Sequence, residues 1–166
     1  MIVVSNTSPL TNLAAINLFH LLQEMYGQIL IADGVWAELN AYNQAWPGSR
    51  EVAAAAWIER LTPKNQPVVS TLRRDLDRGE AETIALALEL GADLVLLDER
   101  DGRYAAQRLG LKVVGVLGLL LEAKSKGYIE QVNPYLDALQ QQAGFYIHEK
   151  LYQQVAKLAG ERKDNN

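Results

Sequence analysis

Oxygen-bearing side chains lie at separate points of the chain, each where a predicted strand ends or a predicted helix begins. They are Asn6, Ser8, Glu38, Glu80, Glu82, Asp98 and Asp101. Carboxylates that are brought together repel one another and destabilise a fold unless a cation joins them. Oxygen ligands without histidine or cysteine suit Mg²⁺ or Mn²⁺. Such ions bind phosphate oxygens and activate a water for in-line attack, so phosphodiester hydrolysis is the chemistry that this set favours.

These residues can meet only if the chain places them at one edge of a sheet. Short apolar runs alternate with helical stretches, a pattern typical of a parallel sheet covered by helices on both faces. We expect strands at 2–4, 28–32, 94–97 and 112–116, and an edge strand at 67–69. Ligands of such sheets bind outside the carboxyl ends of the strands. Asn6, Asp98 and the start of the helix that carries Glu80 all fall at that edge.

Helical periodicity and capping residues place the elements between the strands. Ser8 is predicted to cap the first helix, with Pro9 as its first residue. Gly91 is expected to end the helix that begins at Glu80. The other expected elements are a turn at Asp33-Gly34 and helices at 10–18, 35–39, 51–60, 104–109 and 117–126.

The composition excludes several classes of site. The 166 residues, 49% hydrophobic and 22% charged, suit one domain with a full core. The absence of cysteine excludes disulfides, thiolate zinc sites and cysteine nucleophiles. The glycine-rich P-loop of nucleoside triphosphatases is also absent. A formal net charge of −4 argues against broad nucleic-acid binding, but it is compatible with an acidic centre that a metal neutralises.

The same survey predicts where the protein works. No run of the sequence is apolar and long enough to cross a bilayer. The apolar start is too short for a signal peptide and lacks a basic beginning. We therefore expect a cytoplasmic protein without a membrane partner.

Each acid also has a purely structural interpretation. Glu80 and Glu82 favour a helix N-terminus through its dipole. Asp98 suits a cap or a turn, and Asp101 before Gly102 suits a turn. Only the shared location of these residues raises a functional interpretation above the structural one.

Five segments, in this order, resemble the PIN-domain family and, within it, a toxin-like prokaryotic subgroup. The segments are 3–10 (VVSNTSPL), 35–39 (VWAEL), 79–87 (GEAETIALA), 96–103 (LLDERDGR) and 109–118 (LGLKVVGVLG). Each match is weak by itself, but the ordered set is specific and covers roughly residues 2–130.

The resemblance implies a three-layer α/β/α sandwich with a parallel central sheet. We expect a PIN-like nuclease domain at 1–130 and a C-terminal helical extension, packed on or beside it, at 131–166. The implied activity is an endoribonuclease that depends on Mg²⁺ or Mn²⁺. For VapC-like toxins, the resemblance further implies a homodimer and a cognate antitoxin protein.

The resemblance also implies the roles of individual residues. Those assigned to catalysis are Asn6, Ser8, Glu38, Glu80, Asp98 and Asp101. The metal is expected on Asn6, Glu80, Asp98 and Asp101, with Glu38 and Glu82 as second choices. Asn6 stands where the family has its first aspartate. An amide oxygen can bind a hard cation but brings no charge, so metal binding is expected to be weaker.

Contacts with the RNA substrate are expected from Arg100 and Arg103, which flank the last acids and suit phosphate oxygens. Trp46 is the expected exposed aromatic, suited to stacking on a base. Trp36 and Trp57 are expected in the core.

Three functions stay open at this point. The first is an active PIN ribonuclease, the toxin of a toxin–antitoxin pair. The second is a catalytically weak PIN relative that binds RNA or a protein, because Asn6 replaces the aspartate. The third is an unrelated α/β phosphotransfer domain, which ranks last because Asn6 removes the nucleophile such a domain needs.

Overall fold

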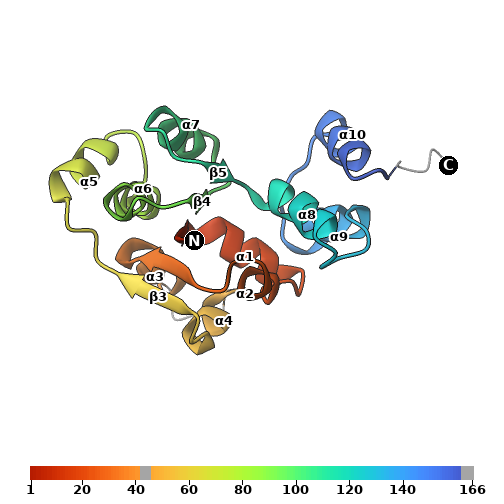
Figure 1. Ribbon diagram of the computed structural model, residues 1–166, viewed down its shortest axis with the longest axis horizontal. Coiled ribbons are helices and arrows are strands. Elements are labelled where there is room, and N and C mark those ends of the chain that lie inside the picture. The colour runs from red at the N-terminus through yellow and green to blue at the C-terminus, as the bar shows by residue number, and fades with distance from the viewer. Residues whose placement is uncertain (42–45, 162–166) are drawn as a thin grey trace.

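Five short parallel strands form the centre of the fold, shown in Figure 1. The computed structural model describes residues 1–41 and 46–161. The strands are β1 (Val3–Ser5), β2 (Ile29–Ala32), β3 (Ile58–Leu61), β4 (Leu94–Leu96) and β5 (Val113–Val114). Their order in the sheet is β3-β2-β1-β4-β5. The predicted parallel sheet is therefore confirmed.

Helices connect and cover the strands. They are α1 (Thr7–Ala15), α2 (Leu21–Tyr26), α3 (Asp33–Leu39), α4 (Ser49–Ala54), α5 (Gln66–Leu72), α6 (Arg78–Leu90), α7 (Arg100–Arg108), α8 (Val116–Ser125), α9 (Asn133–Gln142) and α10 (Glu149–Leu158). Among the described residues, none of these helices is both long and apolar enough to cross a membrane.

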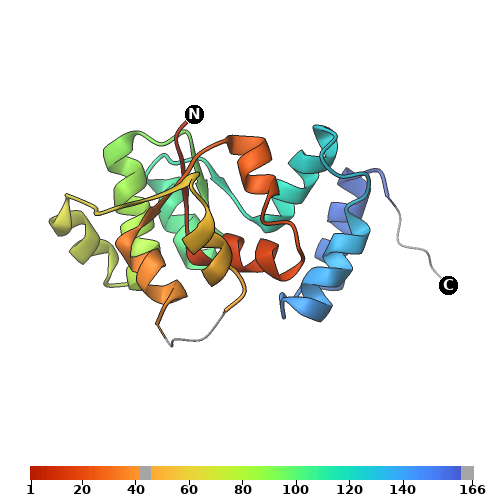
Figure 2. The same ribbon diagram turned by 90° about the horizontal axis from the view of Figure 1, so that it is seen from below.

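Alternation along each strand divides the core into two layers. Val3 and Leu96 face a cluster formed with α1, α2, α8, α9 and α10, whereas Val4 and Val95 face a cluster formed with α5, α6 and α7. This follows because successive side chains of a strand point to opposite faces of the sheet. Figures 1 and 2 show helices on both sides of the strands. The predicted α/β/α sandwich is therefore confirmed.

The strand order creates a crevice at the centre of the sheet. The chain first adds β2 and β3 on one side of β1, and later adds β4 and β5 on the other side. In parallel sheets, ligands bind at the carboxyl ends of the strands where the winding direction changes in this way. Here that point lies between the end of β1 and the end of β4.

The start of α1 differs from the prediction. Asn6, not Ser8, is the N-cap, and Ser8 and Pro9 are already the second and third helical residues. The Asn6 N–H still pairs with the sheet, donating to the Leu96 carbonyl over 2.9 Å. The chain then turns into the helix at once, so the sheet contact fixes the helix start earlier than the sequence pattern indicates. The predicted turn at Asp33-Gly34 is also wrong, because α3 begins at Asp33 directly after β2.

The edge strand also lies elsewhere than predicted. The alanine-rich helix ends at Ala54, and β3 (Ile58–Leu61) pairs in register with β2. Charged residues on β3 suit an edge strand, which they protect from pairing with other chains. The predicted strand at 67–69 is instead part of α5, whose cap is Asn65. Its side chain accepts from the Val68 N–H over 3.2 Å, and Pro67 lies at the helix start, where proline is tolerated.

The C-terminal helices share the core of the rest of the chain. Leu136, Leu139, Tyr152 and Val155 are buried in the cluster that also contains residues of α1 and α8. Figure 2 shows α9 and α10 at one end of the sandwich, beside α8.

Glu161 fastens the end of the described chain to this assembly. Its carboxylate accepts from the Val132 N–H over 2.7 Å, from the Asn133 N–H over 3.1 Å and from Lys124 Nζ over 2.9 Å. Burial alone would raise the pKa of Glu161, but these donors outweigh it and hold the pKa below its usual value.

We expect Glu161→Ala to lower the free energy of unfolding by about 2 kcal/mol, because it leaves two backbone N–H groups at the start of α9 without their acceptor. Urea unfolding measures the change. The exposed Glu130 provides a control, and Glu130→Ala is expected to have almost no effect. Equal effects of the two substitutions would show that the Glu161 contacts contribute nothing to stability.

Candidate active site

The end of β1 places an amide oxygen at the bottom of the crevice. Asn6 is only 4% exposed, and its Oδ1 has no hydrogen-bond partner within the described part of the chain. Gly79 of α6 faces it closely: a Cβ on Gly79 would lie 3.3 Å from Asn6 Oδ1 and 2.8 Å from Glu38 Oε2. The absence of a side chain at Gly79 therefore leaves room for these oxygens to face one another.

The first acid of the site, Glu38, comes from α3, which follows β2. Thr7 Oγ1, in the first turn of α1, donates to Glu38 Oε2 over 2.5 Å. This contact holds the Glu38 carboxylate near Asn6, toward the exposed side of the crevice.

Two further acids, Asp77 and Glu80, lie at the start of α6. Asp77 is the N-cap, and its Oδ1 accepts from the Glu80 N–H over 2.8 Å. In return, Glu80 Oε2 accepts from the Asp77 N–H over 3.1 Å. This is a capping box, which stabilises the helix start and fixes both carboxylates at the same place. Glu80 is 8% exposed, so its charge is largely removed from water.

The last two acids, Asp98 and Glu99, follow β4. Asp98 Oδ1 accepts from the Val116 N–H at the start of α8 over 2.7 Å. Its other oxygen, Oδ2, is buried and has no hydrogen-bond partner among the described residues. The next residue, Glu99, accepts through Oε1 from the Ser8 hydroxyl over 3.2 Å. Ser8, for which a hydrogen bond within the site is predicted, thus donates to the Glu99 carboxylate.

We call the set Asn6, Glu38, Asp77, Glu80, Asp98 and Glu99 the acidic cleft. Burial raises the pKa of Glu38, and the Asp77 and Glu99 carboxylates raise it further, against the hydrogen bond from Thr7. Burial also raises the pKa of Glu80, with added repulsion from Asp77, Glu99 and Glu38. Acids from three segments therefore oppose one another's ionisation.

Asp98 is shifted in the same direction. Burial raises its pKa, and the Glu99 carboxylate adds to this effect. The Val116 N–H, the Asn12 amide and the Arg103 guanidinium act in the opposite direction but do not cancel it. Convergent carboxylates with raised pKa values mark a candidate functional site.

Gly115 lets Arg103 and Asp98 approach each other. A Cβ on Gly115 would lie 2.7 Å from Asp98 Oδ1 and would also clash with Arg103 Nη1. The Arg103 Nη1 atom also donates to the Leu97 carbonyl over 3.4 Å. Arg103 therefore lies beside the Asp98 carboxylate.

We expect Gly115→Ala to weaken Mg²⁺ binding roughly tenfold, because the new methyl group displaces Asp98 from the Val116 N–H, a hydrogen bond to a charged group. Isothermal titration calorimetry measures the affinity. Gly118→Ala is the matched control, because a Cβ there meets only Val114 Cγ1, at 3.2 Å. Unchanged affinity in Gly115→Ala would show that the site tolerates the displacement.

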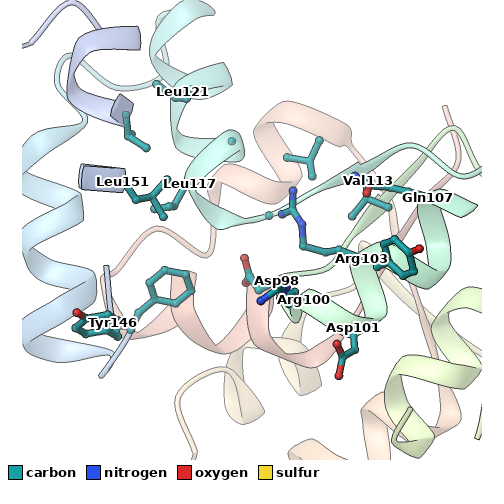
Figure 3. A pocket seen from close by; sticks show the side chains of 16 residues that line it. Asp98, Arg100, Asp101, Arg103, Gln107, Val113, Leu117, Leu121, Tyr146 and Leu151 are labelled. Carbon is teal, nitrogen blue, oxygen red and sulfur yellow. The ribbon is translucent and has the colours of Figure 1, made fainter. Parts of the chain in front are cut away.

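A hollow of about 940 Å³ lies beside Asp98, and Figure 3 shows the side chains that line it. Asp98, Arg100 and Arg103 lie at one side of it, and Leu117, Tyr146 and Leu151 lie at the other. Arg100 and Arg103 thus lie near the acidic cleft, where the sequence predicts phosphate contacts.

The structure does not bring Asp101 into the acidic cleft. Asp101 is exposed in the first turn of α7, and Figure 3 shows its carboxylate directed away from that of Asp98. It differs in this from the ligand role that the resemblance implies. The turn from β4 into α7 is the reason, because it rotates the residue three positions after Asp98 to another side.

Glu82 also lies apart from the cleft. It is buried at 5% exposure, and its Oε2 accepts from Arg78 Nε over 2.8 Å as an ion pair. Its charge is therefore already balanced by a neighbour on the same helix.

Asp77 and Glu99 are the acids that the sequence analysis did not assign to the site. The spacing of Asp77 and Glu80 is that of a capping box, and this signal identifies Asp77. Glu99 follows Asp98 directly and is exposed at the surface, but it also accepts from the Ser8 hydroxyl and repels the other acids. Trp46 is 47% exposed as predicted, and Trp36 and Trp57 pack partly buried against the core.

The donor set fits a hard divalent cation. Two buried oxygens, Asn6 Oδ1 and Asp98 Oδ2, lack hydrogen-bond partners in the described ranges, and the acids around them repel one another. Within residues 1–41 and 46–161, no three acidic or histidine side chains are already spaced to hold a metal. Metal binding therefore requires the more exposed carboxylates to move inward.

An α/β/α sandwich with an acidic cleft at the carboxyl edge of its parallel sheet defines a nuclease-type fold. A family model described as a PIN domain matches residues 2–161. The chain belongs to the PIN-domain family. PIN domains are generally nucleases and typically use divalent metal ions. No curated protein sequence matches the chain.

Proposed function

We propose that this protein is an endoribonuclease that depends on Mg²⁺ or Mn²⁺ and works through the acidic cleft. The observation that carries the proposal is the pair of buried, unpartnered oxygens, Asn6 Oδ1 and Asp98 Oδ2, among carboxylates whose pKa values are raised. A divalent cation satisfies both oxygens and removes the repulsion. Membership of a nuclease family supports the same chemistry.

Each residue of the cleft has a distinct task in this proposal. Asn6, Glu80 and Asp98 would hold the metal, and the Val116 N–H keeps Asp98 oriented. Glu38 and Glu99, held by Thr7 and Ser8, lie ready to orient a water or complete the ligand set. Arg103 and Arg100 lie beside Asp98, where they can bind phosphate oxygens of the substrate. When bound there, a divalent metal would supply polarisation of the phosphate and activation of a water.

The test combines metal binding with cleavage. The purified protein is titrated with Mg²⁺ and Mn²⁺ by calorimetry, and a mixed RNA pool is assayed under the same conditions with and without EDTA. Metal-dependent cleavage that EDTA abolishes supports the proposal. Metal binding without cleavage of any RNA supports the alternative of a catalytically weak relative that binds RNA or a protein, for which the uncharged Asn6 is the specific observation. Absence of metal binding contradicts both assignments of the cleft.

The biological setting that we propose is the toxin half of a toxin–antitoxin pair, acting in the cytoplasm as a homodimer. This part rests on the resemblance of segments such as 109–118 to toxin-like PIN proteins. Growth arrest on induced expression, relieved by co-expression of a small protein encoded beside the gene, is the expected result. Unimpaired growth during production of active nuclease would contradict the toxin assignment.

The raised pKa values predict a characteristic pH dependence of stability. An acid whose pKa is higher in the folded than in the unfolded state binds more protons when folded, between the two values. The free energy of unfolding therefore falls as pH rises through that interval. Here the interval begins at the ordinary values of 3.8 for Asp98 and 4.5 for Glu38 and Glu80. The lowered pKa values of Asp33 and Glu161 act only below their ordinary values of 3.8 and 4.5.

We therefore expect the metal-free protein to gain thermal stability as pH is lowered from 7 towards 4.5, and saturating Mg²⁺ to remove this gain. Melting temperatures in EDTA and in Mg²⁺ at each pH measure the effect. Glu80→Gln, which keeps the capping hydrogen bonds, is expected to show a shallower slope in EDTA. If the melting temperature changed with pH equally in wild type and Glu80→Gln, the ionisation of Glu80 would not destabilise the metal-free protein.

A further inference from the structure

A second hollow, of about 520 Å³, opens beside the acidic cleft. It lies between one side of α1, the end of α3, the segment Trp46-Pro47 and the end of α9. We call it the side pocket. Its volume lies within the ~300–1,000 Å³ range of small-molecule sites.

The side pocket is continuous with the acidic cleft. Thr7, Ser8 and Glu38 line the pocket, and these are the residues that orient or form the acids of the cleft. A chain whose phosphate is bound at the cleft therefore has its neighbouring unit at the pocket. Glu38 belongs to both the acidic cleft and the side pocket, so the two adjoin at this side chain.

The lining of the side pocket combines one exposed ring with amides and hydroxyls. Trp46 supplies an aromatic ring and is 47% exposed. Gln142 supplies an amide group, which both donates and accepts hydrogen bonds, whereas the Asn12 amide is directed to Asp98. Thr11 adds a hydroxyl whose proton goes to the Ser8 carbonyl over 3.1 Å, which leaves its oxygen as an acceptor. A flat ring with a nearby amide matches the recognition of a nucleobase, which stacks and forms hydrogen bonds at its edge.

We propose that the side pocket binds the base and ribose of the nucleotide next to the bond that is cut, and so gives the enzyme a base preference. The inference rests on the proposed nuclease function. A base and a ribose carry no charge, so the Glu38 carboxylate at the edge of the side pocket does not repel them. Gln142 and Ala143 make α9 a wall of the pocket, so the C-terminal helices take part in substrate recognition.

Nucleosides are the probe of choice, because a free phosphate would meet the carboxylates of Glu38 and Glu99 when no metal is present. The full-length protein in EDTA is titrated with adenosine, guanosine, cytidine, uridine and ribose, and binding is followed by saturation-transfer NMR. At least one nucleoside is expected to bind, and ribose alone is expected not to. Trp46→Ala is expected to weaken that binding roughly tenfold, the usual cost of losing a base-stacking ring. Trp46→Phe, which keeps a ring, is expected to remain within about threefold of wild type.

Gln142→Ala is expected to change the order of preference among the four nucleosides, whereas Gln153→Ala on α10 leaves it unchanged. Nucleoside binding that is equal in wild type and Trp46→Ala, or that ribose matches, overturns the proposal, as does failure of all four nucleosides to bind. The result is independent of the nuclease assay, since no metal and no cleavage are involved. Nucleoside binding through Trp46 without any cleavage would leave the side pocket standing and remove the nuclease proposal. RNA cleavage combined with nucleoside binding that does not depend on Trp46 would support the nuclease proposal and overturn the side-pocket proposal.

Discussion

Asp98→Asn is expected to reduce metal-dependent RNA cleavage by at least about 100-fold, since even outer-shell partners of metal ligands commonly cost 10- to 100-fold. Asp98 combines one oxygen held by the Val116 N–H with a second, buried oxygen without a partner in the described residues. An asparagine keeps the first contact but removes the charge that the metal needs. Initial rates at saturating Mg²⁺ measure the loss.

Asp101→Asn is the matched control, because it makes the same chemical change three residues along the chain. Asp101 is exposed and directed away from Asp98, so its variant is expected to retain activity within about twofold, as ordinary surface substitutions do. Melting temperatures in EDTA should not fall in Asp98→Asn, because the change removes a repelling charge. If Asp101→Asn abolishes cleavage as well, the ligand role that the family resemblance implies for Asp101 is correct and the geometry argument fails.

Asn6→Asp is expected to tighten Mg²⁺ binding roughly 100-fold, because ligand charge count sets affinity and a carboxylate replaces a neutral amide close to a divalent ion. Asn6 is 4% exposed, so the added charge is poorly screened. The same substitution is expected to destabilise the metal-free protein by about 1–3 kcal/mol, since it adds a buried charge among repelling acids. Calorimetry gives the affinity, and urea unfolding in EDTA gives the stability.

Asn133→Asp provides the control for this change. Asn133 also has a buried amide oxygen without a partner among the described residues, but it lies at the start of α9 rather than in the cleft. Its conversion to aspartate is expected to leave metal affinity unchanged. Equal affinities for wild type and Asn6→Asp would mean that residue 6 does not contact the metal.

The sequence predicted most strands from their apolar runs: β1, β2 and β4 are largely buried, and the edge strand β5 is half-buried. The runs that became β1, β2, β4 and β5 are continuously apolar, and only a covered parallel sheet explains such runs. β3 was missed because it lacks this apolar signal: its sequence IERL places two charged residues in solvent. The proline of 67–69 suggested an edge strand, yet a proline suits the start of a helix equally well, and the Asn65 cap decides the matter.

Some residues of the candidate site could be predicted from the sequence, and others could not. Asn6, Glu38, Glu80 and Asp98 could be predicted because each lies beside an element end that the apolar pattern already places. Asp77 and Glu99 were not assigned to the site because their positions before α6 and α7 already have a structural explanation as helix N-caps, and only the fold brings their charges beside the other acids.

By itself, the sequence determined the class of fold and the kind of chemistry. Periodicity fixes which segments are buried, and the exclusion of cysteine, of a P-loop and of a histidine cluster leaves carboxylate and amide oxygens as the reactive groups. Only the tertiary structure decided which of these oxygens meet. Asp98 and Asp101 are three residues apart, yet the turn from β4 into α7 keeps one at the crevice and directs the other away. Glu38, Asp77 and Glu99 are far apart in the chain, yet strand order and the turns at the sheet edge bring their charges together.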